Sequence, residues 1–135
     1  MPKEKILVVD DDRGLLTLMK ARLAAAGYDV ILAGSGEEAL TLAQETIFNA
    51  AIVDLKMEGM DGITLLERVL KIQPNLPVII LTAYGTIAGA VEATKKGAYD
   101  YLTKPFEAKD LLYRLSKAME VRRLKVEVDR LRSLV

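Results

Sequence analysis

Short apolar runs alternate with amphipathic segments along the whole chain. Each run is mostly β-branched or aliphatic and apolar almost throughout, which is typical of a strand that is covered on both faces. Strands of this kind indicate a parallel sheet, because antiparallel strands more often alternate polar with apolar residues. The pattern predicts strands at 5–9, 29–33, 50–53, 77–81 and 98–102.

The segments between these runs carry apolar residues at helical spacing and end near a glycine or a proline. The second segment begins with Ser35 and Glu38, which form a capping box. Five strands that alternate with five helices predict an α/β domain with a parallel sheet and helices on both faces. We expect helices at 14–26, 36–46, 62–72, 86–96 and from Ala108 onward.

Composition narrows the chemistry that this domain can perform. The chain has 135 residues, enough for one domain with a substantial core. It contains neither cysteine nor histidine. These absences exclude thiolate chemistry, serine–histidine triads and nearly all zinc sites, and they fit a cytoplasmic protein without disulfides. Basic and acidic residues balance at 19 each, and no run is long enough to cross a membrane, so we expect neither a nucleic-acid nor a membrane partner.

Candidate functional side chains follow the predicted strands. Asp10 and Asp11 follow the first strand, Asp54 the third, Thr82 the fourth and Lys104 the fifth. The carboxyl ends of parallel strands share one edge of the sheet, so these groups should converge. Carboxylates are ligands for Mg²⁺, and an ammonium and a hydroxyl can hold phosphoryl oxygens. Asp54 stands alone at the end of a buried strand, where a nucleophilic carboxylate would be placed.

Four motifs carry a resemblance to a known family. They are ILVVDDD (6–12), AIVDLKMEGMDG (51–62), LTAYG (81–85) and GAYDYLTKPF (97–106). Together, in this order and spacing, they resemble the receiver domain of two-component response regulators over about residues 4–118. The resemblance implies a five-stranded parallel sheet of flavodoxin-like order with five helices.

The resemblance also implies a role for each acidic residue. Asp54 matches the phospho-acceptor, which takes a phosphoryl group from a histidine on a sensor kinase. Asp10 and Asp11 match the acidic pair that holds Mg²⁺, and the main-chain oxygen of Lys56 would be a further ligand. Asp12 has no role in the family, and we interpret it as a cap or first-turn charge of the following helix.

The remaining family positions concern the response to phosphorylation. Thr82 matches the hydroxyl that moves to the phosphoryl group, and Tyr101 matches the aromatic residue that changes rotamer with it. Lys104 matches the lysine that pairs with the phosphate. Receivers of this family have a cis bond before the next residue, here Pro105.

The segment LTAYGTIAGAVEATKKGAYDYLTKPF is similar to receivers of the NtrC-like class. Such receivers precede an AAA+ ATPase that activates sigma-54 RNA polymerase, and a DNA-binding domain. We expect a receiver at 1–118 and a helical linker at 119–135 that leads to an absent downstream domain.

Three residues near the site bear on its chemistry, and one of them departs from the family pattern. Glu58 stands where proline is usual, and we expect it to loosen its loop and to point to solvent. Lys56 and Tyr84 occupy the two positions that flank the phosphoryl group in the family. Both are bulky, and we hypothesise that they obstruct the attacking water and lengthen the phosphoryl lifetime.

The tail contains a heptad pattern with valine at each a position and leucine at each d position, a choice that favours a parallel two-stranded coiled coil. Glu120 would face Lys125 of a second copy, and Glu127 would face Arg132. We therefore predict that the fifth helix continues into the seam of a homodimer. The surface formed by helices four and five and strand five should contribute to the same dimer contact. The seam comprises Val121, Leu124, Val128, Leu131 and Val135.

Alternative functions remain open at this point. An unphosphorylated pseudo-receiver would serve only as a dimerisation module, although the intact set of site residues argues against it. A haloacid-dehalogenase-like Mg²⁺ phosphatase would use Asp10 and Asp12 as its Asp-x-Asp pair, but Gly14 stands where that family expects Thr or Val. The tail could instead pack on its own domain as a solvated helix. We expect a regulatory phospho-acceptor domain, not an enzyme.

Overall fold

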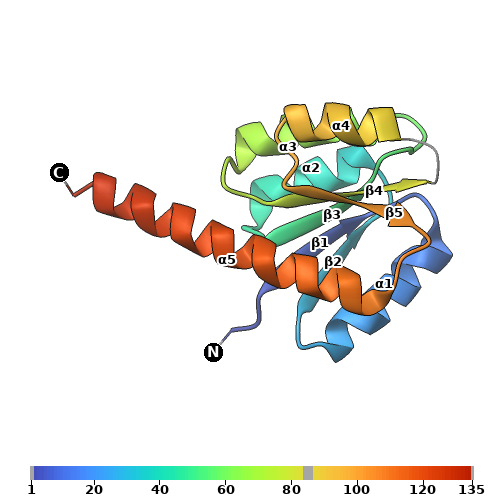
Figure 1. Ribbon diagram of the computed structural model, residues 1–135, viewed down its shortest axis with the longest axis horizontal. Helices are drawn as coiled ribbons and strands as arrows, with labels where there is room; N and C mark the ends of the chain where they lie inside the picture. The colour runs from blue at the N-terminus through green and yellow to red at the C-terminus, as the bar shows by residue number, and fades with distance from the viewer. Residues whose placement is uncertain (1, 84–86, 135) are drawn as a thin grey trace.

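Five parallel strands form the central sheet of the computed structural model, which describes residues 2–83 and 87–134 (Figure 1). The strand order is β2-β1-β3-β4-β5, which is the flavodoxin-like order expected from the sequence. The order reverses at β1, so a crevice for a ligand is expected beside β1 and β3 at their carboxyl ends. The strands are β1 (Lys5–Val9), β2 (Asp29–Ala33), β3 (Ala50–Asp54), β4 (Val78–Ala83) and β5 (Asp100–Lys104).

Helices cover both faces of this sheet (Figure 1). One face packs against α1 and α5, and the other packs against α2, α3 and α4. Within β1, Ile6 and Val8 join the core beneath α1 and α5, whereas Leu7 and Val9 join the opposite core. This two-sided burial explains why the central strands β1, β3 and β4 are apolar along most of their length. The helices are α1 (Arg13–Ala25), α2 (Gly36–Glu45), α3 (Gly62–Ile72), α4 (Ile87–Lys95) and α5 (Ala108–Arg132).

Two predicted strands are displaced from their observed positions. The strand predicted at 77–81 is 78–83, and the one predicted at 98–102 is 100–104. The start of β5 is late because Ala98 completes the turn after α4, where its N–H donates to the Ala93 carbonyl at 3.0 Å. Gly97, with φ of 110°, makes this helix-ending turn possible. The other predicted elements agree with the structure within one residue at each end.

Helix α5 continues well past the domain as one uninterrupted helix (Figure 1). Its buried residues end with Ala118 and Met119. Beyond them, Arg123 forms an ion pair with Glu4 at 2.9 Å. The predicted continuity of this helix is therefore confirmed as far as Arg132, whereas Val135 lies outside the described residues.

Candidate functional site

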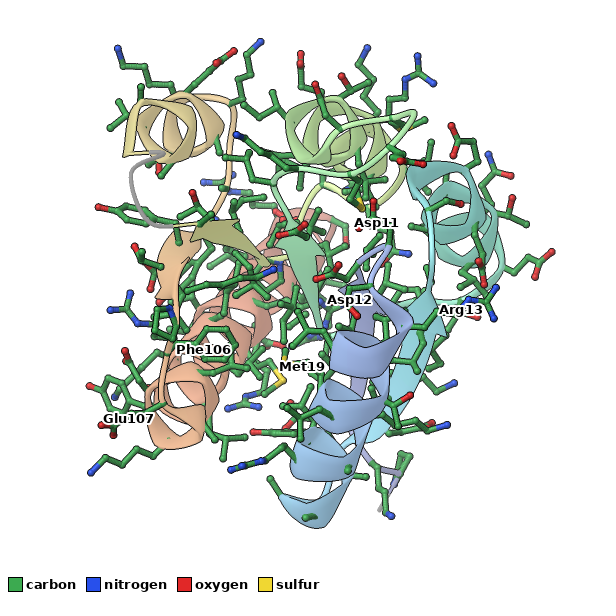
Figure 2. All side chains as sticks on the ribbon, turned by 90° about the vertical axis from the view of Figure 1, so that its right-hand side faces the viewer. Asp11, Asp12, Arg13, Met19, Phe106 and Glu107 are labelled. Carbon is green, nitrogen blue, oxygen red and sulfur yellow. The ribbon has the colours of Figure 1, made fainter. Side chains whose placement is uncertain are left out.

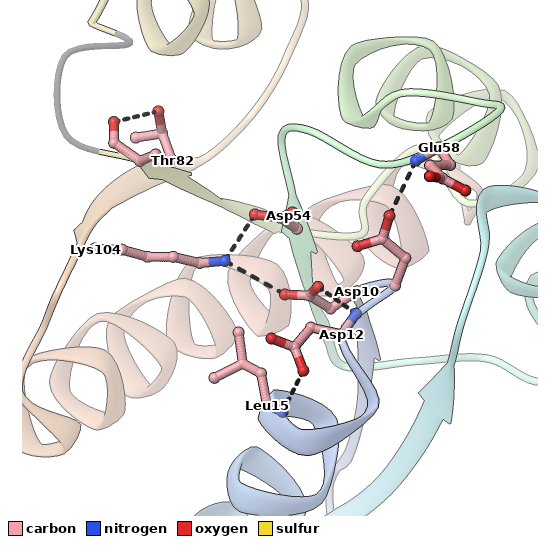
Figure 3. A network of polar contacts seen from close by, with 9 residues as sticks. Asp10, Asp12, Leu15, Asp54, Glu58, Thr82 and Lys104 are labelled. Carbon is pink, nitrogen blue, oxygen red and sulfur yellow. Dashed lines mark hydrogen bonds and ion pairs between the residues drawn. The ribbon is translucent and has the colours of Figure 1, made fainter.

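The site lies at the carboxyl edge of the sheet, where β1, β3 and β5 end (Figure 3). Asp10 directly follows β1, and its exposed fraction is 2%. Asp54 is the last residue of β3 and is 8% exposed. Lys104 is the last residue of β5 and reaches across to both carboxylates. Because the strands are parallel, their carboxyl ends lie at one edge of the sheet and bring together residues that are far apart in the sequence, as the strand pattern predicts.

Lys104 links the two buried carboxylates. Its Nζ donates to Asp54 Oδ1 at 3.0 Å and to Asp10 Oδ2 at 3.4 Å (Figure 3). The other oxygen of Asp10 accepts the main-chain N–H of Asp12 at 2.9 Å. Both buried carboxylates therefore have a hydrogen-bond donor, as buried charges require.

A third carboxylate completes an oxygen cluster that fits a divalent cation. One carboxylate oxygen each from Asp10, Asp11 and Asp54 lies within 4.8 Å of the other two. Asp11 is exposed, and its Oδ2 accepts the main-chain N–H of Glu58 at 3.0 Å. Hard cations such as Mg²⁺ take carboxylate oxygens together with water, so this set of donors suits Mg²⁺. Lys56 lies two residues after Asp54 on the same loop, and its main-chain oxygen stays a predicted ligand.

Burial and neighbouring charges shift the pKa values of two groups in the site. Burial raises the pKa of Asp54 and outweighs the hydrogen bond from Lys104, which lowers it. For Lys104, burial lowers the pKa, but the bond to Asp54 and the charges of Asp10 and Asp54 together raise it. Both shifts favour the protonated forms. A bound cation would supply the missing positive charge.

Asp12 has a separate structural role. Its side chain accepts the main-chain N–H of Leu15 at 3.2 Å and caps α1, as predicted (Figure 3). Figure 2 shows Asp11 and Asp12 beside the start of this helix. A haloacid-dehalogenase-like site would instead need the Asp12 carboxylate in the site itself, as the second member of its Asp-x-Asp pair. The capping bond and the cluster formed by Asp10, Asp11 and Asp54 disfavour that alternative.

The two predicted switch residues lie on neighbouring strands. Thr82 is 2% exposed, stands opposite Thr103 in the register of β4 with β5, and donates its hydroxyl to the Ala83 carbonyl at 3.3 Å. Tyr101 lies on the edge strand β5 and is 37% exposed. Thr82 and Lys104 were expected after their strands, but both lie within them.

The bond between Lys104 and Pro105 is cis, as predicted. Tyr84, the second residue expected to flank the phosphoryl group, lies outside the described residues.

Two polar features of the structure, one in the site and one at the other end of β5, were not predicted. The first is the main-chain N–H of Glu58, which has no side-chain signature in a sequence. The second is Arg114, which binds Asp100 at 2.8 Å, Asp110 at 3.0 Å and the main-chain oxygen of Tyr101 at 3.2 Å. The spacing of Asp110 and Arg114 on one helix could have indicated part of this second network.

Three of the predicted seam residues on α5 are exposed beyond the domain, whereas Val121 is half-buried. Leu124, Val128 and Leu131 have exposed fractions of 63%, 44% and 49%. The tail still contacts its own domain, because Arg123 pairs with Glu4 at 2.9 Å and Asn75 donates to Asp129 at 2.8 Å. The dimer seam and the solvated intramolecular helix both stay predictions. No helix in the described ranges combines the length and apolar character needed to cross a bilayer.

The sequence of this chain is similar to a known family and to known transcriptional regulatory proteins. The family model for the response regulator receiver domain matches residues 6–116. The transcriptional regulatory protein GlrR of Escherichia coli K12 is 48% identical over 108 residues, which are 80% of this chain and 24% of that protein. The transcriptional regulatory protein ZraR of the same organism is 45% identical over 114 residues, or 84% of this chain and 26% of that protein. The chain thus spans about a quarter of the length of these curated relatives.

A solved structure extends the comparison to the fold. The crystal structure of NtrX from Brucella abortus in complex with ADP superposes with a TM-score of 0.91 at 33% identity and covers 96% of this chain and 30% of that one. The similarity to GlrR, ZraR and NtrX is consistent with the resemblance to NtrC-like regulators. The matched motifs, the strand order and the acidic cluster lead to one family. The chain belongs to the response regulator receiver domain family.

Proposed function

We propose that this domain is a phosphorylation-dependent switch in which Asp54 accepts a phosphoryl group from a sensor histidine kinase with the help of Mg²⁺. The observation that carries the proposal is the placement of Asp54. Its carboxylate is buried at the end of β3, bonded to Lys104 at 3.0 Å and within 4.8 Å of oxygens from Asp10 and Asp11.

The chemistry of the transfer follows from this placement. An oxygen of Asp54 would attack the phosphorus of a phosphohistidine, so that a phosphorus–oxygen bond forms while the phosphorus–nitrogen bond breaks and the departing imidazole takes up a proton. Asp10, Asp11 and the main-chain oxygen of Lys56 would hold Mg²⁺, which supplies charge neutralisation when bound. Lys104 is already within reach of Asp54 and would bind a phosphoryl oxygen.

The response to phosphorylation would involve the two residues on β4 and β5. Thr82 would turn its hydroxyl to the phosphoryl group, and Tyr101, on the edge of the sheet, would change rotamer with it. In the wider protein we expect the domain to act in the cytoplasm and to control a downstream AAA+ domain that activates sigma-54 RNA polymerase. This part of the proposal rests on the resemblance to NtrC-like receivers.

The α5 extension would bring two copies together. At about 100° per residue, the seam lies roughly 150° around the helix from the buried stripe that includes Leu111 and Leu115. A second copy could therefore pair along Leu124, Val128 and Leu131 without displacing the receiver domain. Valine at a and leucine at d favour a parallel pair. Whether phosphorylation forms, breaks or rearranges this dimer is decided by the experiment below.

The test uses acetyl phosphate as a small phosphodonor, with and without Mg²⁺. Intact-mass spectrometry should show a single phosphoryl addition that requires Mg²⁺ and is absent in Asp54→Asn. Light scattering with and without beryllofluoride would report the dimer state. Failure of the parent protein to be modified would refute the switch and favour the pseudo-receiver. Rapid turnover of many phosphate esters would instead favour the phosphatase.

A further inference from the structure

The loop between β3 and α3 is attached to the acidic cluster by its main chain. The N–H of Glu58 donates to Asp11 Oδ2 at 3.0 Å, across a separation of 47 residues in the sequence (Figure 3). The Glu58 side chain is exposed, as predicted, and plays no part in this bond. The contact therefore depends on residue 58 having an N–H, which every residue except proline provides.

Two further contacts restrain the part of this loop that leads into α3. Met60 packs on the start of α2 so closely that a Cβ on Gly36 would lie 2.8 Å from its Sδ. Asp61 caps α3 by accepting the N–H of Thr64 at 2.8 Å. These contacts restrain the loop at Asp11 and at both neighbouring helices, and the expectation that Glu58 loosens it relative to proline stays a prediction.

Asp11 needs a restraint of this kind. It is the exposed member of the cluster, so its side chain has the most rotamer freedom to lose when it binds a cation. Without a cation, repulsion from Asp10 and Asp54 favours rotamers that point away from the cluster. A charge-assisted hydrogen bond to one oxygen of Asp11 limits the rotamer freedom of this side chain and opposes the repulsion from Asp10 and Asp54. The second oxygen of Asp11 stays available for the cation.

We propose that the main-chain N–H of Glu58 positions Asp11 for the cation site. It would hold Oδ2 of Asp11 so that the carboxylate stays within reach of Asp10 and Asp54 before the cation arrives. This inference rests on the proposed Mg²⁺-dependent function. Donors that orient a metal-binding carboxylate in this way commonly change affinity when they are removed.

The test compares Glu58→Pro with Glu58→Ala, because both remove the carboxylate and only proline removes the N–H. Isothermal titration calorimetry should give Glu58→Ala an Mg²⁺ affinity within about twofold of the parent. Glu58→Pro should bind Mg²⁺ about tenfold more weakly than Glu58→Ala. Circular dichroism establishes that each variant is folded. Equal affinities of the two variants would overturn the proposal.

A second measurement does not depend on the proline variant. Hydrogen exchange by NMR should show a protected Glu58 amide in the metal-free parent and faster exchange in Asp11→Ala. An amide that exchanges at the same rate in both proteins would show that the bond is absent and would overturn the inference alone. A parent protein that does not bind Mg²⁺ would overturn the proposed function together with this inference.

Discussion

The ammonium of Lys104 should contribute strongly to the stability of the metal-free domain. It bonds to two carboxylates, Asp54 and Asp10, whose side chains are 12% and 3% exposed. Lys104→Met keeps much of the apolar stem but removes the charge. The two carboxylates would then face each other in a poorly hydrated site without a counter-ion, a situation that buried charges tolerate badly.

The distances set the size of the effect. At an effective dielectric constant of about 20, the contacts of 3.0 and 3.4 Å each correspond to roughly 5 kcal/mol of gross attraction. Desolvation of the charges cancels much of this attraction. Removing one partner of a buried pair costs about 3–5 kcal/mol. Because the Lys104 side chain is 30% exposed, we expect a loss of about 2–3 kcal/mol in the free energy of unfolding at pH 7.

Urea unfolding in the presence and absence of Mg²⁺ tests whether this loss comes from charge. A divalent cation replaces the missing positive charge, so the variant should bind Mg²⁺ more tightly than the parent. The stability difference between them should therefore shrink as Mg²⁺ is added. A double variant with Asp54→Asn should recover much of the loss, because one of the two unpaired carboxylates is gone.

Acidification should act in the same direction as Mg²⁺. The folded-state pKa of Asp54 is raised above its ordinary value by burial, despite the bond from Lys104. A carboxyl group of this kind takes up a proton in the folded state first, so it adds stability as the pH falls through the raised pKa. Without Lys104 that pKa should rise further, and the loss in Lys104→Met should diminish as the pH is lowered from 7 toward 5.

An exposed ion pair provides the matched control. Lys96 binds Glu67 at 3.3 Å, but the two side chains are 38% and 48% exposed. Lys96→Met should cost less than about 1 kcal/mol, and Mg²⁺ should not change that cost. If Lys104→Met lost the same stability with and without Mg²⁺, and if Asp54→Asn did not rescue it, Lys104 would be stabilising through packing and the electrostatic reasoning would be wrong.

Three further substitutions test other parts of the structure. Gln73→Met should lose about 2–4 kcal/mol in urea unfolding, since the Gln73 amide bonds to three main-chain groups in the last turn of α2 and the loop that follows it; a loss below about 1 kcal/mol would contradict this. Gly62→Ala should lower both thermal stability and Mg²⁺ affinity, because a Cβ at this position would lie 2.5 Å from the main-chain oxygen of Asp54. An unchanged Mg²⁺ affinity would show that the loop relaxes freely. Leu131→Glu should give a monomer by light scattering, whereas the off-seam control Val126→Glu should keep the oligomeric state of the parent protein. A dimer of the Leu131→Glu variant would exclude the seam.

The fold was predictable because both faces of the sheet are covered. In β1 every residue from Ile6 to Val9 is almost fully buried, and alternate residues belong to opposite cores. A continuous apolar run therefore marks the strand and implies helices on both sides. The order of elements then brings the residues at the strand ends to one edge. This is why Asp10, Asp54 and Lys104 could be grouped before their distances were known.

The errors have a physical origin in main-chain bonding. The run at 98–102 is apolar at its start, but Ala98 completes the turn after α4. Asp100 begins β5 although it is charged, because Arg114 holds its carboxylate at 2.8 Å. The bond from Glu58 to Asp11 is likewise invisible in a pattern of side chains. Side-chain patterns predict burial well, but they do not show which main-chain donors remain for a loop to use.

The hydrogen bonds of the acidic cluster explain why it is ordered yet still attracts a cation. Each carboxylate has its own donor: Asp10 accepts an N–H two residues further on, Asp11 accepts that of Glu58, and Asp54 accepts the ammonium of Lys104. Two of these donors are neutral, so they fix geometry without cancelling charge. In the described part of the chain, the ammonium of Lys104 bonds to Asp10 and Asp54 only, so the three carboxylates keep a formal excess of two negative charges. A divalent cation matches that excess. Burial is the main cause of the raised pKa of Asp54, with a smaller contribution from Asp10, and the bond to Asp54 and the charges of Asp10 and Asp54 raise the pKa of Lys104 against its burial.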